Sequence, residues 1–207
     1  MNQIEKEILK ILYINQNAKI KSNIGYLEIN LLLDKRNIEN ICRNMEKNKL
    51  INKINTEYFI TEKGKSKLII VMIGGVFDII HPGHIITLKL AKGLGDVLIV
   101  SVARDQNVLR YKKHKPINEE IRRCELINSI KYVDLGILGS EKNIFDTVMK
   151  LKPNIIALGY DQKHNEIEFK NKLDELKLNI KLIRLESPIP DIKSSEILKQ
   201  PDKIKDF

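Results

Sequence analysis

Apolar residues in the first third of the chain recur with the spacing of amphipathic helices. The three stripes are Ile4, Ile8, Ile11 and Leu12; Leu27, Leu31 and Leu32; and Ile38, Ile41, Cys42 and Met45. Asp34 is a suitable N-cap for the third helix. The short segments 50–54 and 58–61 flank a polar turn and predict a β-hairpin. We therefore expect a small α+β domain over residues 1–66.

The rest of the chain alternates apolar strands with helical segments. The predicted strands are 68–73, 97–102, 133–138, 155–158 and 180–185, and the predicted helices are 85–93, 119–129, 144–151 and 166–176. Continuous apolar strands separated by helices are typical of a parallel sheet that is buried on both faces. The pattern predicts an α/β domain over residues 67–207, a doubly wound five-stranded parallel sheet.

The apolar share of 43% and the charged share of 30% are typical of a globular protein and exclude a disordered or fibrous one. The chain has 207 residues and a formal net charge of +9, from 36 basic and 27 acidic residues. Residues 1–67 hold 13 basic and 8 acidic residues, a net +5, and residues 68–207 hold 23 and 19, a net +4. The longest apolar run, 68–77, is shorter than the roughly 20 residues of a membrane span. With no signal-peptide pattern at its start, we expect a cytoplasmic protein that has no membrane partner.

The two cysteines, Cys42 and Cys124, lie far apart and in no CxxC pattern. Neither a disulfide framework nor a zinc site is expected, and we predict no metal-ligating residues.

Candidate chemistry gathers in the loop after the first strand of the α/β domain, residues 74–84. Ligands of open α/β sheets bind at the carboxyl ends of strands. Glycines let backbone N–H groups approach a phosphate, and His81 and His84 are spaced to face one point at a helix start. The loop therefore predicts a polyphosphate site. The GxGxxG fingerprint and the P-loop are both absent, which disfavours ordinary dinucleotide and kinase-type binding.

The motif in this loop, G-x-F-D-x-x-H-x-G-H, resembles the nucleotidylyltransferase signature of the cytidylyltransferase superfamily. The resemblance extends through most of residues 68–199 and implies a Rossmann-like fold. It also implies that His81 and His84 bind nucleotide phosphates and stabilise the transition state. The other implied nucleotide-binding residues of the loop are Gly75, Val76, Phe77, Asp78 and Gly83. Position 76 is Val where many members have Thr, and its backbone N–H is retained.

Five later segments resemble further parts of the family site. Arg104 and Asp105 follow the second strand, and the basic loop 112–117 carries Lys115, for which the resemblance implies phosphate contact. Arg122 matches the arginine of an E-x-x-R element, so Lys115 and Arg122 join the two histidines as expected catalytic residues. The remaining nucleotide-binding expectations fall near the end of the chain: Gly159, Asp161, Ser194 and Ser195.

The resemblance implies transfer of a nucleoside monophosphate from a nucleoside triphosphate to a phosphomonoester, with release of pyrophosphate. Mg²⁺ would accompany the triphosphate. Within the superfamily, Ala103-Arg104-Asp105 and Gly159-Tyr160-Asp161-Gln162 most resemble the archaeal FAD synthetase type, which transfers AMP from ATP to FMN. The alternative is a CTP-dependent cytidylyltransferase that acts on glycerol 3-phosphate or a similar polyol phosphate.

The N-terminal domain resembles a winged-helix domain, because three helices precede a hairpin that ends in Tyr-x-Ile-Thr-x-Lys-Gly. Arg36, Asn40 and Arg43 on the third helix could then contact DNA. A packing or dimerisation module that touches no DNA is the alternative for this domain. For the whole chain, a nucleotide-sensing regulator is a further alternative. Relatives of this type are commonly dimers, so we expect a homodimer.

Overall fold

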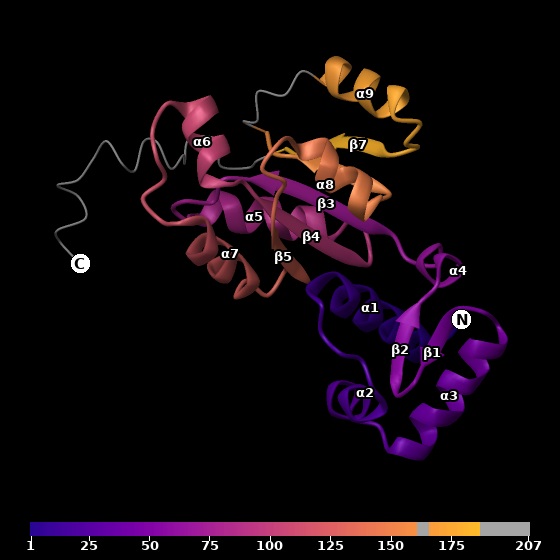
Figure 1. Ribbon diagram of the computed structural model, residues 1–207. Helices are drawn as coiled ribbons and strands as arrows, with labels where there is room; N and C mark the ends of the chain where they lie inside the picture. The colour runs from indigo at the N-terminus through magenta and orange to yellow at the C-terminus, as the bar shows by residue number, and fades with distance from the viewer. Residues whose placement is uncertain (161–165, 187–207) are drawn as a thin grey trace, which may run out of the picture. The chain divides into compact units, whose positions relative to one another are not determined.

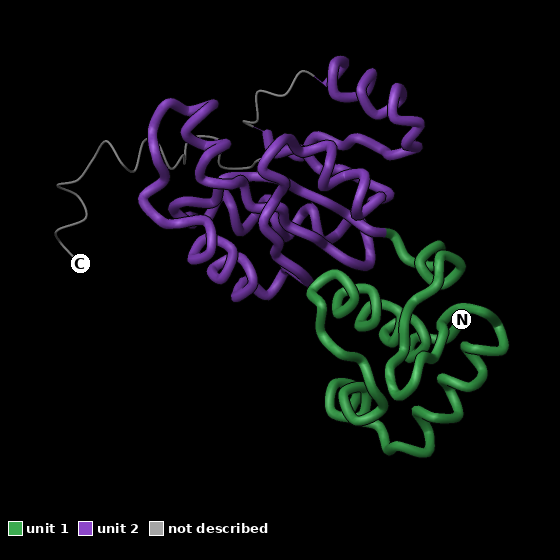
Figure 2. The backbone as a smooth tube through the Cα atoms, in the orientation of Figure 1, with its two compact units in different colours: residues 1–69 green, residues 70–207 purple. Residues whose placement is uncertain are grey.

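The computed structural model describes residues 1–160 and 166–186 of the chain. The chain divides into two compact units, Met1–Ile69 and Ile70–Phe207, which are coloured separately in Figure 2. In the part of the chain that the structure describes, no helix combines the length and the apolar character needed to cross a bilayer.

The first unit consists of helices and a small antiparallel hairpin, as predicted. Its elements are α1 (Gln3–Ala18), α2 (Ile24–Leu31), α3 (Lys35–Lys47), β1 (Ile51–Ile54), β2 (Glu57–Ile60) and α4 (Glu62–Lys65). Asn2, Asn23 and Asp34 cap the first three helices, each side chain accepting a hydrogen bond from a first-turn N–H. Asn23 also forms an isolated antiparallel bridge with Glu57, which joins the start of α2 to the hairpin.

The second unit is the predicted α/β domain, and its five strands are parallel (Figure 1). Its elements are β3 (Ile70–Gly75), α5 (Pro82–Lys92), β4 (Val97–Val102), α6 (Asp105–Lys112), α7 (Glu120–Asn128), β5 (Leu135–Leu138), α8 (Ile144–Leu151), β6 (Ile155–Leu158), α9 (Glu166–Glu175) and β7 (Lys181–Arg184). The strand order is β5-β4-β3-β6-β7. The order reverses between β3 and β6, so the carboxyl ends of these two strands mark the topological switch point where open sheets bind ligands.

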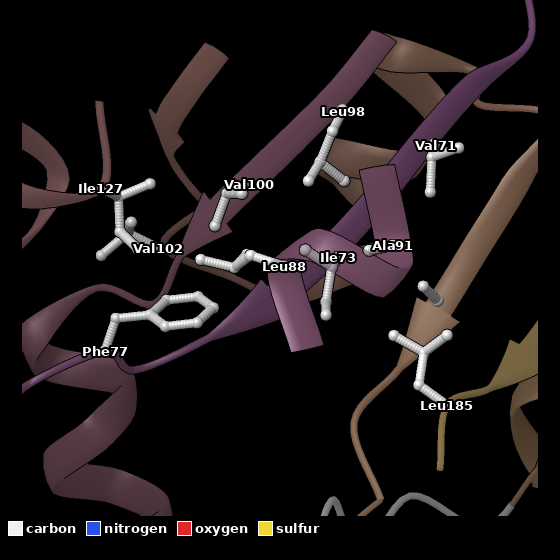
Figure 3. Close-up of a cluster of buried hydrophobic side chains, with 11 residues drawn as sticks. Val71, Ile73, Phe77, Leu88, Ala91, Leu98, Val100, Val102, Ile127 and Leu185 are labelled. Atoms are coloured by element: carbon white, nitrogen blue, oxygen red, sulfur yellow. The ribbon is translucent and has the colours of Figure 1, made fainter. Parts of the chain in front are cut away.

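Apolar side chains from β3, β4, α5 and α7 form the core on one face of this sheet (Figure 3). Leu88 of α5 lies among Ile73, Val100 and Phe77, and all four are at most 5% exposed. Side chains alternate along a strand, so Gly74 faces the opposite side of the sheet from Ile73. A Cβ at Gly74 would lie 3.3 Å from the Cδ1 atom of Ile144, which places α8 on that side. Helices on both faces make the fold doubly wound.

The observed elements differ from the sequence-based expectation in several bounds and in two helices that were not expected, α4 and α6. The strand expected from residue 133, for example, begins at Leu135. The strand expected from residue 68 begins at Ile70, and α5 begins at Pro82 rather than at residue 85 because proline fits the first turn of a helix. The basic segment was expected to be a loop throughout. Its first part is the end of α6, which the apolar pattern missed because Val108 is the buried residue of that helix.

The close packing of Leu50 and Ile60 around Gly64 gives a testable prediction for the stability of the first unit. A Cβ at Gly64 would lie 2.1 Å from the backbone oxygen of Leu50 and 2.9 Å from Ile60 Cγ1. Because a backbone oxygen cannot rotate away, we expect Gly64→Ala to cost at least about 1–3 kcal/mol of local stability. Amide hydrogen exchange in β1 and β2 measures this cost.

Gly25→Ala in α2 is the matched control. The nearest atom to its new Cβ, Asn23 Oδ1, would be 3.5 Å away, which is ordinary van der Waals contact. We expect that variant to retain stability, or to gain about 0.5–1 kcal/mol from helix propensity. Equal protection factors in the two variants would contradict the packing at Gly64.

Candidate active site

The two predicted histidines come together at the carboxyl end of β3. His81 is the N-cap of α5, with φ −141° and ψ 168°, and Pro82 occupies the first turn. The His84 N–H donates to the His81 carbonyl oxygen at 2.9 Å, so one tight turn separates the two residues. Their ring centroids lie 3.9 Å apart with an angle of 39° between the ring planes. The loop therefore brings two tilted imidazoles close together, as the spacing predicted.

Phe77 packs its side chain against His84 and supports the histidine pair. Its backbone is left-handed, with φ 54°, and its side chain is 5% exposed. A Cβ at Gly75 would lie 2.7 Å from Phe77 Cε2, so the ring occupies the space that any other residue at position 75 would fill. The Phe77 ring centroid lies 5.4 Å from that of His84. Glycine at position 75 therefore lets a core phenyl ring contact a histidine of the site.

The start of α5 provides a favourable environment for an anion. The helix begins without a side-chain cap hydrogen bond from His81, and its first turn has no acidic residue. The positive end of the helix dipole is thus not neutralised by its own first turn. Gly83 lies buried in this turn beside the two histidines. Phosphate groups bind readily at helix starts of this kind.

Arg123 of α7 is fully buried and ties three segments of this edge together. Its Nε donates to the Asn118 carbonyl oxygen at 2.9 Å, and its Nη1 donates to the carbonyl oxygen of Val76. Its Nη2 donates to the Ala103 carbonyl oxygen and to Asp105 Oδ1, both at 2.7 Å. One guanidinium therefore fixes the ends of the loops after β3 and β4 and the segment before α7.

Arg104 and Asp105, predicted to contact nucleotide, form a reciprocal connection between α6 and α7. The Asp105 N–H donates to Glu120 Oε2 at 2.7 Å, and the Glu120 N–H donates to Asp105 Oδ2 at 3.2 Å. Arg104 pairs with Glu120 at 2.5 Å and with Glu141 at 3.4 Å. Each acidic residue thus accepts an N–H from the start of the other helix. The structure places both predicted residues at the carboxyl edge, with their side chains engaged in this connection.

Asp78, also predicted to contact nucleotide, faces the end of the basic loop. Its Oδ2 accepts the Ile117 N–H and its Oδ1 accepts the Asn118 N–H, both at 2.8 Å. The Asn118 side-chain amide donates back to the Asp78 carbonyl oxygen at 2.8 Å. Lys115, within the loop that these bonds hold, is exposed.

Arg122, predicted to be the catalytic arginine, is exposed on α7, and its neighbour Arg123 is the buried one. Ile127, one turn after Arg123, is also fully buried, whereas Leu126, one turn after Arg122, is 47% exposed. Arg123 is not among the residues predicted from the sequence. The signal that could have found it is helical phase, because a residue four positions before a core isoleucine faces the core.

Of the four predicted residues near the end of the chain, the structure describes one, Gly159. Gly159 follows β6, the strand that pairs with β3, and its carbonyl oxygen accepts from Arg184 Nη1 at 2.9 Å. The remaining three predicted positions lie outside the described residues: Asp161, Ser194 and Ser195.

The described residues hold no cluster of metal-binding side chains, and burial affects both cysteines. Within residues 1–160 and 166–186, no three His, Cys, Asp or Glu side chains converge as a metal site. Burial raises the pKa of Cys42 to about 11 and also raises the pKa of Cys124. Both thiols are therefore protonated at neutral pH and are poor nucleophiles.

A model of the cytidylyltransferase-like family matches residues 72–200. This range includes the whole of the loop 74–84, which carries His81 and His84 and is called the histidine loop below. The chain belongs to this family. Its membership confirms the predicted enzyme class, a nucleotidyltransferase.

Proteins of similar sequence match the chain over its α/β domain. The chain is 46% identical over 123 residues to the FAD synthase of Pyrococcus horikoshii, a match covering 59% of this chain and 83% of that protein. It is 44% identical over 133 residues to the FAD synthase of Thermoplasma volcanium, covering 64% and 93%. A solved structure titled a lipopolysaccharide core biosynthesis protein from Thermoplasma volcanium is 47% identical, with a TM-score of 0.56, and the match covers 58% of this chain and 98% of that one.

The contrast between Arg122 and Arg123 gives a direct test of the site's construction. Arg123→Met leaves Asp105 without its guanidinium partner and three carbonyl oxygens without their donor. We expect it to cost about 3–5 kcal/mol in free energy of unfolding, measured by urea denaturation. Arg122→Met, at the neighbouring exposed position, should change stability by no more than about 0.5 kcal/mol. Similar losses in both variants would contradict the role given to Arg123.

Proposed function

We propose that the chain is an FMN adenylyltransferase, which transfers AMP from ATP to FMN and releases pyrophosphate. The observation that carries this proposal is the pair of closely apposed imidazoles at the start of α5, with ring centroids 3.9 Å apart. The FAD synthases of Pyrococcus horikoshii and Thermoplasma volcanium, which are similar over most of their own lengths, support FMN as the acceptor.

In the proposed reaction, a phosphate oxygen of FMN attacks the α-phosphorus of ATP. The bond between the α-phosphorus and the oxygen bridging to the β-phosphorus breaks, and that oxygen leaves with pyrophosphate. His81 and His84 would donate hydrogen bonds to phosphate oxygens as negative charge develops on the leaving group. Lys115 would add positive charge, and the start of α5 would orient the phosphates. Positioning and charge stabilisation then provide the acceleration, with no covalent enzyme intermediate.

Magnesium enters this scheme as part of the substrate, the Mg²⁺ complex of ATP. Mg²⁺ retains several waters and prefers phosphate oxygens, so it needs few protein ligands. The carboxylates of Asp78, Asp105 and Glu120 accept N–H groups or pair with arginines. We therefore propose that the triphosphate itself holds the ion. Arg122 is retained as a candidate for contact with phosphate because it is exposed on α7.

The test is to incubate the full chain with Mg²⁺ and either ATP or CTP, with FMN or glycerol 3-phosphate as acceptor, and to measure pyrophosphate and the nucleotide product. We expect FAD from ATP and FMN. His84→Ala should lower turnover by about 10²–10³-fold, because one donor to the developing charge is lost. Arg122→Ala serves as the comparison that decides whether this exposed arginine contributes.

Product formation from CTP and glycerol 3-phosphate alone would contradict FMN as the acceptor and favour the cytidylyltransferase alternative. Wild-type turnover in His84→Ala, with an unchanged circular-dichroism spectrum, would contradict the role given to the histidines.

A second proposal concerns the first unit, where α3 offers a surface for DNA. Its buried positions are Ile38, Cys42 and Met45. Its exposed positions contain no acidic residue: Lys35, Arg36, Asn37, Asn40, Arg43, Asn44 and Lys47. The Arg43 Nη1 atom lies 3.5 Å from Asn40 Oδ1 on this face. Arginine and asparagine side chains are those that most often read base edges in the major groove. A homodimer, which would present this surface twice, is proposed alongside and is tested by light scattering.

We expect the full chain to shift a DNA duplex in a gel at low salt, with an affinity that falls steeply as salt rises. Arg36→Ala with Arg43→Ala should weaken binding and reduce the slope of log K against log salt by about 2. Lys19→Ala with Lys67→Ala is the matched control, since it removes the same charge from two exposed positions outside α3. Absence of binding, or equal losses in both double variants, would contradict this surface.

A further inference from the structure

The histidine loop and the basic loop are joined through one carboxylate. Asp78 lies three residues before His81, and its two carboxylate oxygens accept the consecutive N–H groups of Ile117 and Asn118 at 2.8 Å each. Given the proposed function, on which this inference rests, we infer that Asp78 is a positioning residue. It holds the basic loop so that Lys115 acts on the phosphates bound by the histidines.

The bonds around Asn118 make this end of the loop a fixed point. Asn118 returns a hydrogen bond from its side-chain amide to the Asp78 carbonyl oxygen at 2.8 Å. Its own carbonyl oxygen accepts from Arg123 Nε at 2.9 Å, and Arg123 also binds the Val76 carbonyl oxygen within the histidine loop. Asn118 is therefore attached to the histidine loop directly and through a buried guanidinium.

The other end of the basic loop is fixed by α6. Lys113 is the C-cap of that helix, with φ 64°, and its N–H donates to the Leu109 carbonyl oxygen at 3.0 Å. Four residues, 114–117, then connect this cap to Asn118. A connection this short, held at both ends, restricts where Lys115 can lie, because each residue spans at most about 3.3–3.6 Å.

Charge explains why such a loop needs an anchor. Lys112, Lys113 and Lys115 are all exposed within four positions and repel one another until an anion binds. Hydrogen bonds from N–H groups to a carboxylate are stronger than those between neutral groups. Asp78 can therefore hold the loop in place before the triphosphate arrives, which lowers the entropy lost when the site assembles.

The contacts of Asp78 argue against direct contact with nucleotide. Both of its oxygens already accept backbone N–H groups, and a carboxylate would repel a triphosphate. A residue that acts through Lys115 has a distinct signature: once Lys115 is removed, removing Asp78 as well should have little further effect. A residue that contacts substrate independently would instead give multiplicative losses.

The test is a double-mutant cycle of Asp78→Ala and Lys115→Ala, with kcat and KM for Mg²⁺–ATP measured separately. We expect Asp78→Ala to lower kcat/KM by about 10–100-fold, and the double variant to match Lys115→Ala within about threefold. Asp78→Asn, which keeps one acceptor oxygen, should fall between wild type and Asp78→Ala, and it guards against misfolding of the alanine variant.

Asp134→Asn is the matched control for loss of a structural carboxylate. Asp134 Oδ2 accepts the Leu98 N–H at 2.7 Å and pairs with Lys92 at the amino end of the sheet, the edge opposite the site. Its effect, combined with Lys115→Ala, should be multiplicative. Multiplicative losses for Asp78 and Lys115 would overturn the positioning role.

Trypsin cleavage gives a readout that does not depend on activity. Lys112 and Lys113 offer cleavage sites in and beside the loop, and we expect Asp78→Ala to accelerate cutting there about tenfold while Asp134→Asn does not. Unchanged cleavage in Asp78→Ala would overturn the anchoring. A wild-type chain that forms no FAD would overturn the proposed function, whereas wild-type turnover with a multiplicative cycle would overturn the role of Asp78 alone.

Discussion

A buried guanidinium is the constraint on which the carboxyl edge of the sheet depends. Arg123 is 0% exposed, so its donors must all be satisfied inside the protein. Each of its three side-chain nitrogens donates, to the backbone carbonyl oxygens of Val76, Ala103 and Asn118 and to the carboxylate of Asp105. These partners belong to three separate segments. Burial of one charge therefore requires the three to converge at the edge where β3 and β4 end.

The hydrogen bonds of Arg123 also help to hold the histidine pair in place. Gly75 admits the Phe77 ring, which belongs both to the core beneath β3 and to the surroundings of His84. The imidazoles are thereby attached to the core on one side and to the Arg123 network on the other, through Val76. Catalysis of phosphoryl-type transfer by positioning and electrostatics needs donors that are in place before the charge develops. The fold meets that need with packing and with buried hydrogen bonds.

Much of the fold follows from local patterns, and much of the site does not. Short, largely apolar segments predicted all five strands, and the G-x-F-D-x-x-H-x-G-H motif located the paired histidines. Helix α6 was not predicted, because Val108 is its one buried residue and the helix therefore shows little apolar periodicity. Arg123 differs from its exposed neighbour Arg122 only in helical phase, which the buried Ile127 sets and the E-x-x-R motif does not express. The partners of Asp78 lie 39 and 40 residues further along the chain, a separation that no local pattern reveals.

The central claim is that the paired imidazoles of His81 and His84 bind the phosphates of a nucleotide. The most direct measurement is an NMR titration of the full chain, labelled with ¹⁵N-histidine, with Mg²⁺ and a non-hydrolysable ATP analogue. We expect large, saturable shifts of the ring nitrogens of His81 and His84 as the analogue is added. Binding of the analogue that leaves both of these rings unperturbed would contradict it.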